Sequence, residues 1–152
     1  MKRIPLLFSV LFFLAAGPLQ AQSPELPDYK TEPDSPHVAL IVLSEKWADV
    51  REISGELVKY NVGEYPEKGL VSERVTMPFM SNLPVLYIHY FQNQAEAMEY
   101  YHRLWEDKPD FMQMNIVESV WVFSKGNLNT LLLEESPKRY AAFFDKYYLN
   151  HN

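Results

Sequence analysis

Cysteine is absent from this chain of 152 residues, and glycine is scarce, with only five residues. The absence of cysteine excludes disulfides and a thioether-linked lipid anchor, so a folded domain must rest on its apolar core alone. The glycines form neither a G-x-G-x-x-G nor a P-loop pattern, which excludes two common signatures of nucleotide binding. Lysine and arginine number 14 against 20 acidic residues, for a net charge of −6. Without a basic stripe, the chain is not expected to bind nucleic acid or anionic lipid.

Patterns typical of catalytic and metal sites are missing as well. The four histidines have neither i, i+4 nor H-x-H spacing. We expect His89 to be packed or at an interface and His102 to be solvated on a helix. No serine lies in a G-x-S-x-G frame, and Glu96 and Glu99 are better assigned to a helix cap and to solvent than to an acid–base pair. The sequence therefore predicts a non-enzymatic protein with no cofactor and no metal.

The N-terminus has the three parts of a secretory signal peptide. Lys2 and Arg3 precede an apolar run over residues 6–16, and a Gly-Pro break and Ala21 follow. This pattern predicts a signal peptide over residues 1–22. An uncleaved membrane anchor is the alternative, but an apolar run of about 11 residues is short for a span.

Cleavage of this signal removes two basic residues and no acidic ones, which changes the formal charge from −6 to −8. No second hydrophobic run has membrane length, so we expect no stable membrane insertion after cleavage. An exported chain without cysteine is more typical of a bacterial periplasmic or extracellular surface protein than of a small eukaryotic secreted scaffold.

The region after the signal has the composition of a connector. Residues 23–36 contain four prolines, several charges and little apolar content. They predict a Pro-rich linker or a disordered tail. The folded domain is then expected to span residues 37–152.

A strand, a tight turn and an amphipathic helix follow one another over residues 85–106. Asn93 and Glu96 form a capping box at the start of the helix. The strand is Val85–Phe91, where alternation assigns three side chains to the helix-packed core: Leu86, Ile88 and Tyr90. It assigns four to the opposite face: Val85, Tyr87, His89 and Phe91.

The remaining elements follow from apolar periodicity. Further strands are predicted over residues 38–43, 70–77 and 117–123. Helices are predicted over 47–60, briefly over 128–133, and from Ser136 to about residue 149. Gly55 falls inside the first of these helices, where close packing against the sheet would account for it.

The order of these elements is β-α-β-β-α-β followed by a helix, which predicts an α+β fold of the ferredoxin-like type. We expect an antiparallel four-stranded sheet with two helices on one face and an extra C-terminal helix. The most apolar runs, residues 38–43 and Val85–Phe91, are predicted to be the central strands.

The second face of this sheet is the candidate binding surface. Its outward side chains include Tyr87, His89, Trp121 and Phe123, which are too apolar for a fully solvated face. Three covers are consistent with this composition: the aromatic C-terminal helix, a second copy of the chain, or a ligand.

Two stretches carry a resemblance to a known family. They are F-Q-N-Q-A-E-A-M-E-Y-Y from Phe91 and, near the C-terminus, V-F-S-x-x-N-L-x-x-L-L with R-Y-x-x-F-F-x-x-Y-Y. Over about residues 36–150 the chain resembles the C-terminal domain of Bacteroidetes lipoproteins that carry tetratricopeptide repeats and are associated with gliding motility and type IX secretion. The resemblance implies an envelope-associated, non-catalytic interaction domain. The chain differs from those proteins in having neither the repeats nor a lipobox cysteine.

A weaker similarity is to SPOR domains, which share the βαββαβ order and the junction from Phe91 to Ala97. That similarity implies binding of denuded peptidoglycan glycan on the open sheet face, with Tyr87, His89 and Trp121 stacking on sugars. The two expectations are therefore a domain that binds another protein or itself, a homodimer included, and a peptidoglycan-binding domain.

Overall fold

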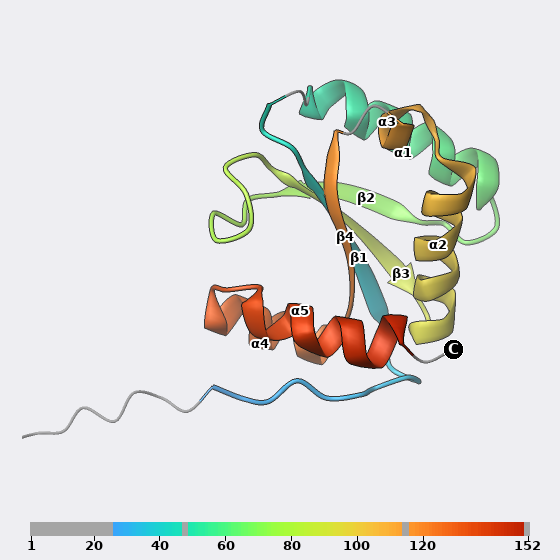
Figure 1. Cartoon of the computed structure of the whole chain (residues 1–152). Helices are drawn as coiled ribbons and strands as arrows, with labels where there is room; N and C mark the ends of the chain where they lie inside the picture. Colours follow the sequence, from blue (N-terminus) through green and yellow to red (C-terminus); the bar gives the residue numbers. More distant parts are fainter. Residues whose placement is uncertain (1–25, 47–48, 114–115, 151–152) are drawn as a thin grey trace, which may run out of the picture.

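The computed structural model describes residues 26–46, 49–113 and 116–150 (Figure 1). The predicted signal peptide lies outside the described residues. The strands are β1 (His37–Leu43), β2 (Val71–Val75), β3 (Val85–Phe91) and β4 (Val117–Ser124). The α-helices are α1 (Val50–Glu64), α2 (Gln94–Asp107), α3 (Asp110–Gln113), α4 (Lys125–Glu134) and α5 (Lys138–Phe144), and α5 continues as a π-helix, η1 (Asp145–Leu149).

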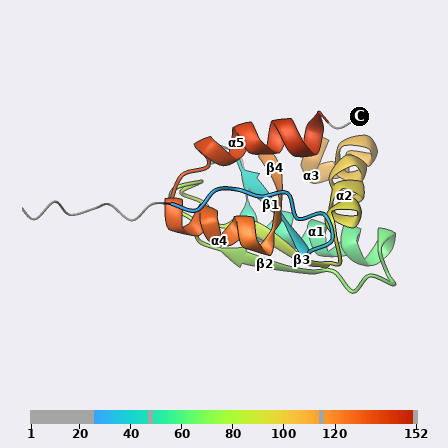
Figure 2. The same ribbon diagram turned by 90° about the horizontal axis from the view of Figure 1, so that it is seen from below.

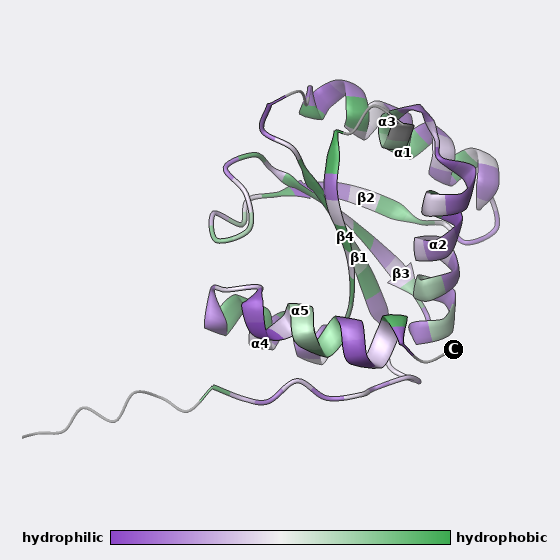
Figure 3. Ribbon diagram, in the orientation of Figure 1, coloured by the Kyte–Doolittle hydropathy of each residue, from purple (hydrophilic) through white to green (hydrophobic). Residues whose placement is uncertain are grey.

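The four strands form one antiparallel sheet in the order β2-β3-β1-β4. Strand β3 lies between β1 and β2, and β1 lies between β3 and β4, so each βαβ unit is split by a strand of the other. This confirms the predicted α+β, ferredoxin-like sheet and its two central strands. Every residue of β1 is buried, because a central strand covered on both faces has no side chain in contact with water. Figure 3 shows the hydrophobic residues of this strand at the centre of the molecule.

Helices α1 and α2 pack together over one face of the sheet. The buried hydroxyl of Tyr100 on α2 donates to the Asn61 side chain on α1 at 2.8 Å, and the Tyr100 ring contacts Phe91 of β3 with centroids 5.1 Å apart. The predicted capping box is present: Asn93 accepts from the amide of Glu96, whose carboxylate accepts from the amide of Gln92. These contacts fix the start of α2 against the sheet.

The first helix differs from its predicted range of 47–60. It begins at Val50, because the Asp49 carboxylate caps the amides of Arg51 and Glu52, and it continues to Glu64 because Asn61 is buried against α2. The explanation expected for Gly55 is wrong. A Cβ built on this glycine meets nothing within 4 Å, so close packing does not require it.

The region predicted as a linker or disordered tail is packed against the domain over its described part. Residues 26–36, here called the strap, run between α4 and α5 (Figure 2). The side-chain amide of Asn127 accepts from the backbone N–H of Lys30 and donates to its carbonyl, at 2.9 and 2.8 Å. Ser124 donates to Glu32 at 2.5 Å. The prolines of this segment were interpreted as signs of a linker. In the structure they belong to an extended backbone whose polar groups are satisfied by side chains of the domain.

Tyr29 anchors the strap to the C-terminal helix. Its ring lies 4.9 Å from that of Tyr140 and 5.8 Å from that of Phe143, and its hydroxyl donates to Glu134 at 2.6 Å. Burial of the ring and the adjacent Glu134 carboxylate raise the pKa of the Tyr29 hydroxyl above its ordinary value. The aromatic side chains of the strap and α5 thus form one layer that packs on β4.

Candidate functional site

Helix α5 divides the predicted binding face in two. Phe123 is fully buried, with its ring stacked 3.9 Å from that of Tyr140. Trp121 is half-buried, and its ring lies 6.2 Å from Tyr140 and 5.7 Å from Phe144. Of the three covers considered from the sequence, the aromatic helix is the one present over β4, so Phe123 offers no surface to a partner.

The half of the face that β3 and β2 supply is more open. Tyr87 and His89 are half-buried there, with ring centroids 5.3 Å apart. In the register of β2 and β3, Glu73 is opposite Tyr87 and Val71 is opposite His89. The Glu73 carboxylate lies 3.5 Å from Nε2 of His89. Burial, and secondarily the charge of Glu73, raise the pKa of the Tyr87 hydroxyl.

Tyr90 joins this surface, although the alternation of side chains predicted it to lie in the core. The β1–β3 register shifts between the His37 and Ala39 pairings, and Tyr90 has a φ of +83°. This β-bulge turns Tyr90 outward, leaving it 57% exposed, and brings Phe91 into the core instead. The Tyr90 ring lies 4.2 Å from that of His89. The three adjacent rings of Tyr87, His89 and Tyr90 are called the ring stripe below.

Sequence reasoning had no signal for this bulge. It is set by the pairing of β3 with β1, since period-2 alternation in a strand assumes an unbroken ladder. A tyrosine in the left-handed region is uncommon and costs about 1–2 kcal/mol. Such outliers cluster at functional sites, which makes Tyr90 a candidate contact residue.

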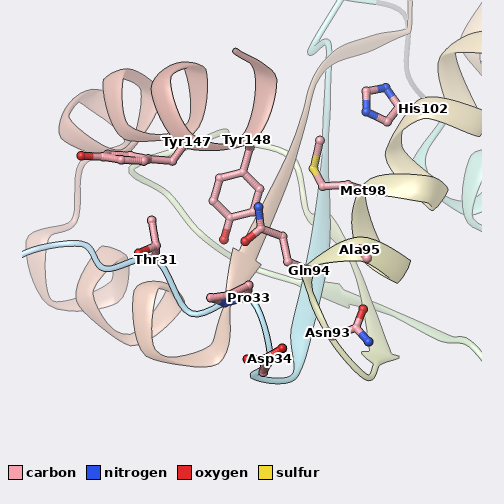
Figure 4. A pocket seen from close by; sticks show the side chains of 10 residues that line it. All are labelled: Thr31, Pro33, Asp34, Asn93, Gln94, Ala95, Met98, His102, Tyr147 and Tyr148. Carbon is pink, nitrogen blue, oxygen red and sulfur yellow. The ribbon is translucent and has the colours of Figure 1, made fainter. Parts of the chain in front are cut away.

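A groove lies where the strap, the start of α2 and η1 meet (Figure 4). Its volume is about 880 Å³. The backbone N–H of Gln94 donates to the carbonyl of Pro33 at 2.9 Å, which holds the strap against α2. Figure 4 shows the Tyr148 ring pointing toward Gln94 and Pro33. The groove is lined by Thr31, Pro33, Asp34, Asn93, Gln94, Ala95, Met98, His102, Tyr147 and Tyr148. Because the strap forms one wall, a sequence interpretation that treats residues 23–36 as a linker cannot find this groove.

The three histidines that the structure describes are dispersed across the fold. His37 is buried and shares a hydrogen bond of 3.0 Å with the hydroxyl of Tyr148, His89 belongs to the ring stripe, and His102 is exposed at the groove, as predicted for a helix-surface residue. Within residues 26–46, 49–113 and 116–150, no group of three or more His, Asp or Glu side chains is placed to hold a metal ion. No helix in the same ranges is long and apolar enough to cross a membrane.

Comparisons of the chain with protein-family models, with curated proteins and with solved structures found no match. The function is therefore inferred from the geometry of the ring stripe and the groove.

Proposed function

We propose that this chain is an exported, non-catalytic protein-interaction domain of the bacterial cell envelope, whose contact surface is the ring stripe with the adjoining edge strand β2. The observation that carries the proposal is the outward tyrosine of the β-bulge. Tyr90 is 57% exposed, is held at a φ of +83° and continues the line of Tyr87 and His89.

The chemistry of this surface suits a protein partner. Tyrosine is enriched at the energetic centres of interfaces because it offers a large apolar face and a polar tip at little cost in side-chain entropy. Val71 of β2, 40% exposed, extends the apolar area beside His89. Strand β2 is at the edge of the sheet, where unpaired backbone groups can receive a strand of a partner.

The alternative, glycan binding in the SPOR manner, has less support at this face. It requires Tyr87, His89 and Trp121 to form one open platform. Helix α5 lies over β4 and packs on Trp121, so two of the three rings remain for sugar stacking. A stripe of rings beside an edge strand is better suited to a second polypeptide, either a different envelope protein or another copy of this chain.

A photocrosslinking experiment tests the proposal. A benzophenone amino acid would replace Tyr90 in cells that naturally export the chain, and Trp105 would be the matched control. Trp105 is an aromatic residue on α2 that is 39% exposed. We expect a discrete protein adduct at position 90 and none at position 105. A mass of twice the chain would identify self-association.

Two outcomes would contradict the proposal. One is equal crosslinking at the two positions, which would indicate random collisions. The other is enrichment of the chain on amidase-treated peptidoglycan that is lost in Tyr90→Ala, because that result would make the stripe a glycan site.

A further inference from the structure

We propose that the groove between the strap, α2 and η1 binds a neutral oligosaccharide. This site is separate from the ring stripe and goes beyond the proposed protein contact. Its volume of about 880 Å³ is within the range of ligand sites, about 300–1,000 Å³. The class of ligand follows from the polar groups, the apolar surfaces and the charge of the lining.

The polar groups are amides, a hydroxyl, the His102 imidazole and a carboxylate that the described part of the chain leaves largely uncommitted. Asn93 uses its carbonyl oxygen to cap Glu96, which leaves its NH₂ group. No hydrogen bond to the side chains of Gln94, Asp34 or Thr31 is present among the described residues. These groups offer donors and acceptors side by side, and sugar hydroxyls need both because each hydroxyl donates and accepts.

The apolar part of the lining consists of flat or compact surfaces. From η1, Tyr147 contributes a half-buried ring and Tyr148 contributes the small exposed part of a buried ring. Met98 contributes a thioether from α2, and Pro33 contributes its ring from the strap. The C–H faces of a sugar ring are apolar and match such surfaces, while its edge hydroxyls reach the surrounding amides. A peptide or a lipid chain would match this combination of polar groups and apolar surfaces less well, because a sugar ring carries hydroxyls around its whole edge.

The charge of the lining argues for a neutral ligand. Among the described residues that line the groove, Asp34 is the only acidic one, and none is a lysine or an arginine. The N-terminus of α2 would attract an anion, but the Asn93 and Glu96 side chains already occupy it. Most glycoside hydrolases use a pair of carboxylates, and the described lining supplies one, so we expect the groove to bind the sugar without cleaving it.

The groove is held in shape before any ligand arrives. The strap is fixed at Pro33 by the amide of Gln94 and at Lys30 by the Asn127 side chain. The Tyr148 hydroxyl is held by His37. A preformed site avoids the ordering cost of binding, which matters for sugars because each hydrogen bond replaces one to water.

The test is a titration of the ¹⁵N-labelled exported chain, residues 23–152, with chitotetraose and with cellotetraose, followed by amide chemical shifts. We expect saturable shifts for at least one sugar, concentrated in residues 31–34, 93–102 and 147–148. Gln94→Ala and His102→Ala should each weaken binding about fivefold, and together about 25-fold, as expected for one lost hydrogen bond each. The Gln94 side chain has no partner among the described residues, and the His102 ring contacts Tyr101 of the same helix at 5.4 Å, so both variants should fold.

Matched controls separate this site from the ring stripe. Asn129→Ala removes an exposed amide on α4, outside the groove, and Tyr90→Ala alters the stripe; both should bind sugar as the unchanged chain does. The inference is overturned if neither sugar gives saturable shifts up to about 10 mM, if the shifts survive in the double variant, or if tetra-alanine produces the same shifts and the sugars do not. If the probe at position 90 gives no protein adduct while the sugar still binds, only the proposed protein contact is rejected.

Discussion

Tyr90 allows the clearest test of the reasoning, because its backbone strain and its ring contact can be measured separately. In Tyr90→Ala the ring is lost while a Cβ remains at a φ of +83°. In Tyr90→Gly the Cβ is lost as well. Relief of left-handed strain should stabilise the glycine variant by about 1–2 kcal/mol relative to the alanine variant. The greater freedom of glycine in the unfolded chain should destabilise it by about 0.4–1 kcal/mol. The glycine variant should therefore be more stable than the alanine variant by about 0.5–1 kcal/mol.

Both variants should be less stable than the unchanged chain. Tyr90 is 57% exposed, so somewhat under half of its roughly 200 Å² is buried, which at about 25 cal/mol per Å² corresponds to at most about 2 kcal/mol. Urea unfolding followed by tryptophan fluorescence measures these differences. An alanine variant that equals or exceeds the glycine variant in stability would refute the claim of strain at the bulge. Binding to the partner should weaken in both variants, since both lack the ring.

Three further predictions concern the scaffold. Gly55→Ala should raise the free energy of unfolding by up to about 1 kcal/mol, since the exposed helical Cβ meets nothing within 4 Å; no change in urea midpoint would contradict this. Burial lowers the pKa of His37, against a smaller raising effect of the hydrogen bond to Ser35, so the folded chain holds the neutral ring. The contribution of neutral His37 to the free energy of unfolding should consequently be fully present above the unfolded pKa of about 6.5 and should decrease as the pH falls below it. In a His37→Gln variant, the free energy of unfolding should decrease less steeply between about pH 6.5 and 5. Tyr29→Ala should lower the free energy of unfolding by about 1–3 kcal/mol, because it loses both the ring packing and the hydroxyl hydrogen bond. Tyr29→Phe should lower it by about 1 kcal/mol, because it loses only the hydrogen bond to Glu134. Equal losses in the two variants, measured by thermal unfolding, would count against the ring as the anchor of the strap.

The tautomer of His37 explains why acid should act through this residue. Its Nδ1 lies 2.7 Å from the carbonyl of Ser35, and a carbonyl only accepts, so Nδ1 carries the proton. Nε2 then accepts from the hydroxyl of Tyr148 at 3.0 Å. Protonation of Nε2 removes this acceptor and leaves a charge in a fully buried position. The strap and η1, which form two walls of the groove, meet at this residue.

The family resemblance remains a prediction. The resemblance implies an envelope-associated interaction domain, and the ring stripe is compatible with such a role without testing it. Export also remains a prediction, because residues 1–25 lie outside the described structure.

Much of the fold followed from local patterns. The capped junction at Asn93 was predictable because a cap and its helix are contiguous in sequence. The central strands were predictable because a strand covered on both faces must be apolar throughout. The extent of α1 was not, since its last turns depend on Asn61 meeting Tyr100, 39 residues away.

The candidate sites depended on contacts that no local pattern contains. The sequence alone determined the sheet order, the aromatic supply of the second face and the scarcity of catalytic groups, because these follow from periodicity and composition. Only the tertiary structure decided which aromatic residues remain accessible. Helix α5 covers Phe123, the bulge in β3 exposes Tyr90, and the strap closes the groove beside Gln94. Each of these outcomes depends on burial and backbone geometry between segments that are distant in sequence. Patterns of period 2 or period 3.6 contain no information on such contacts.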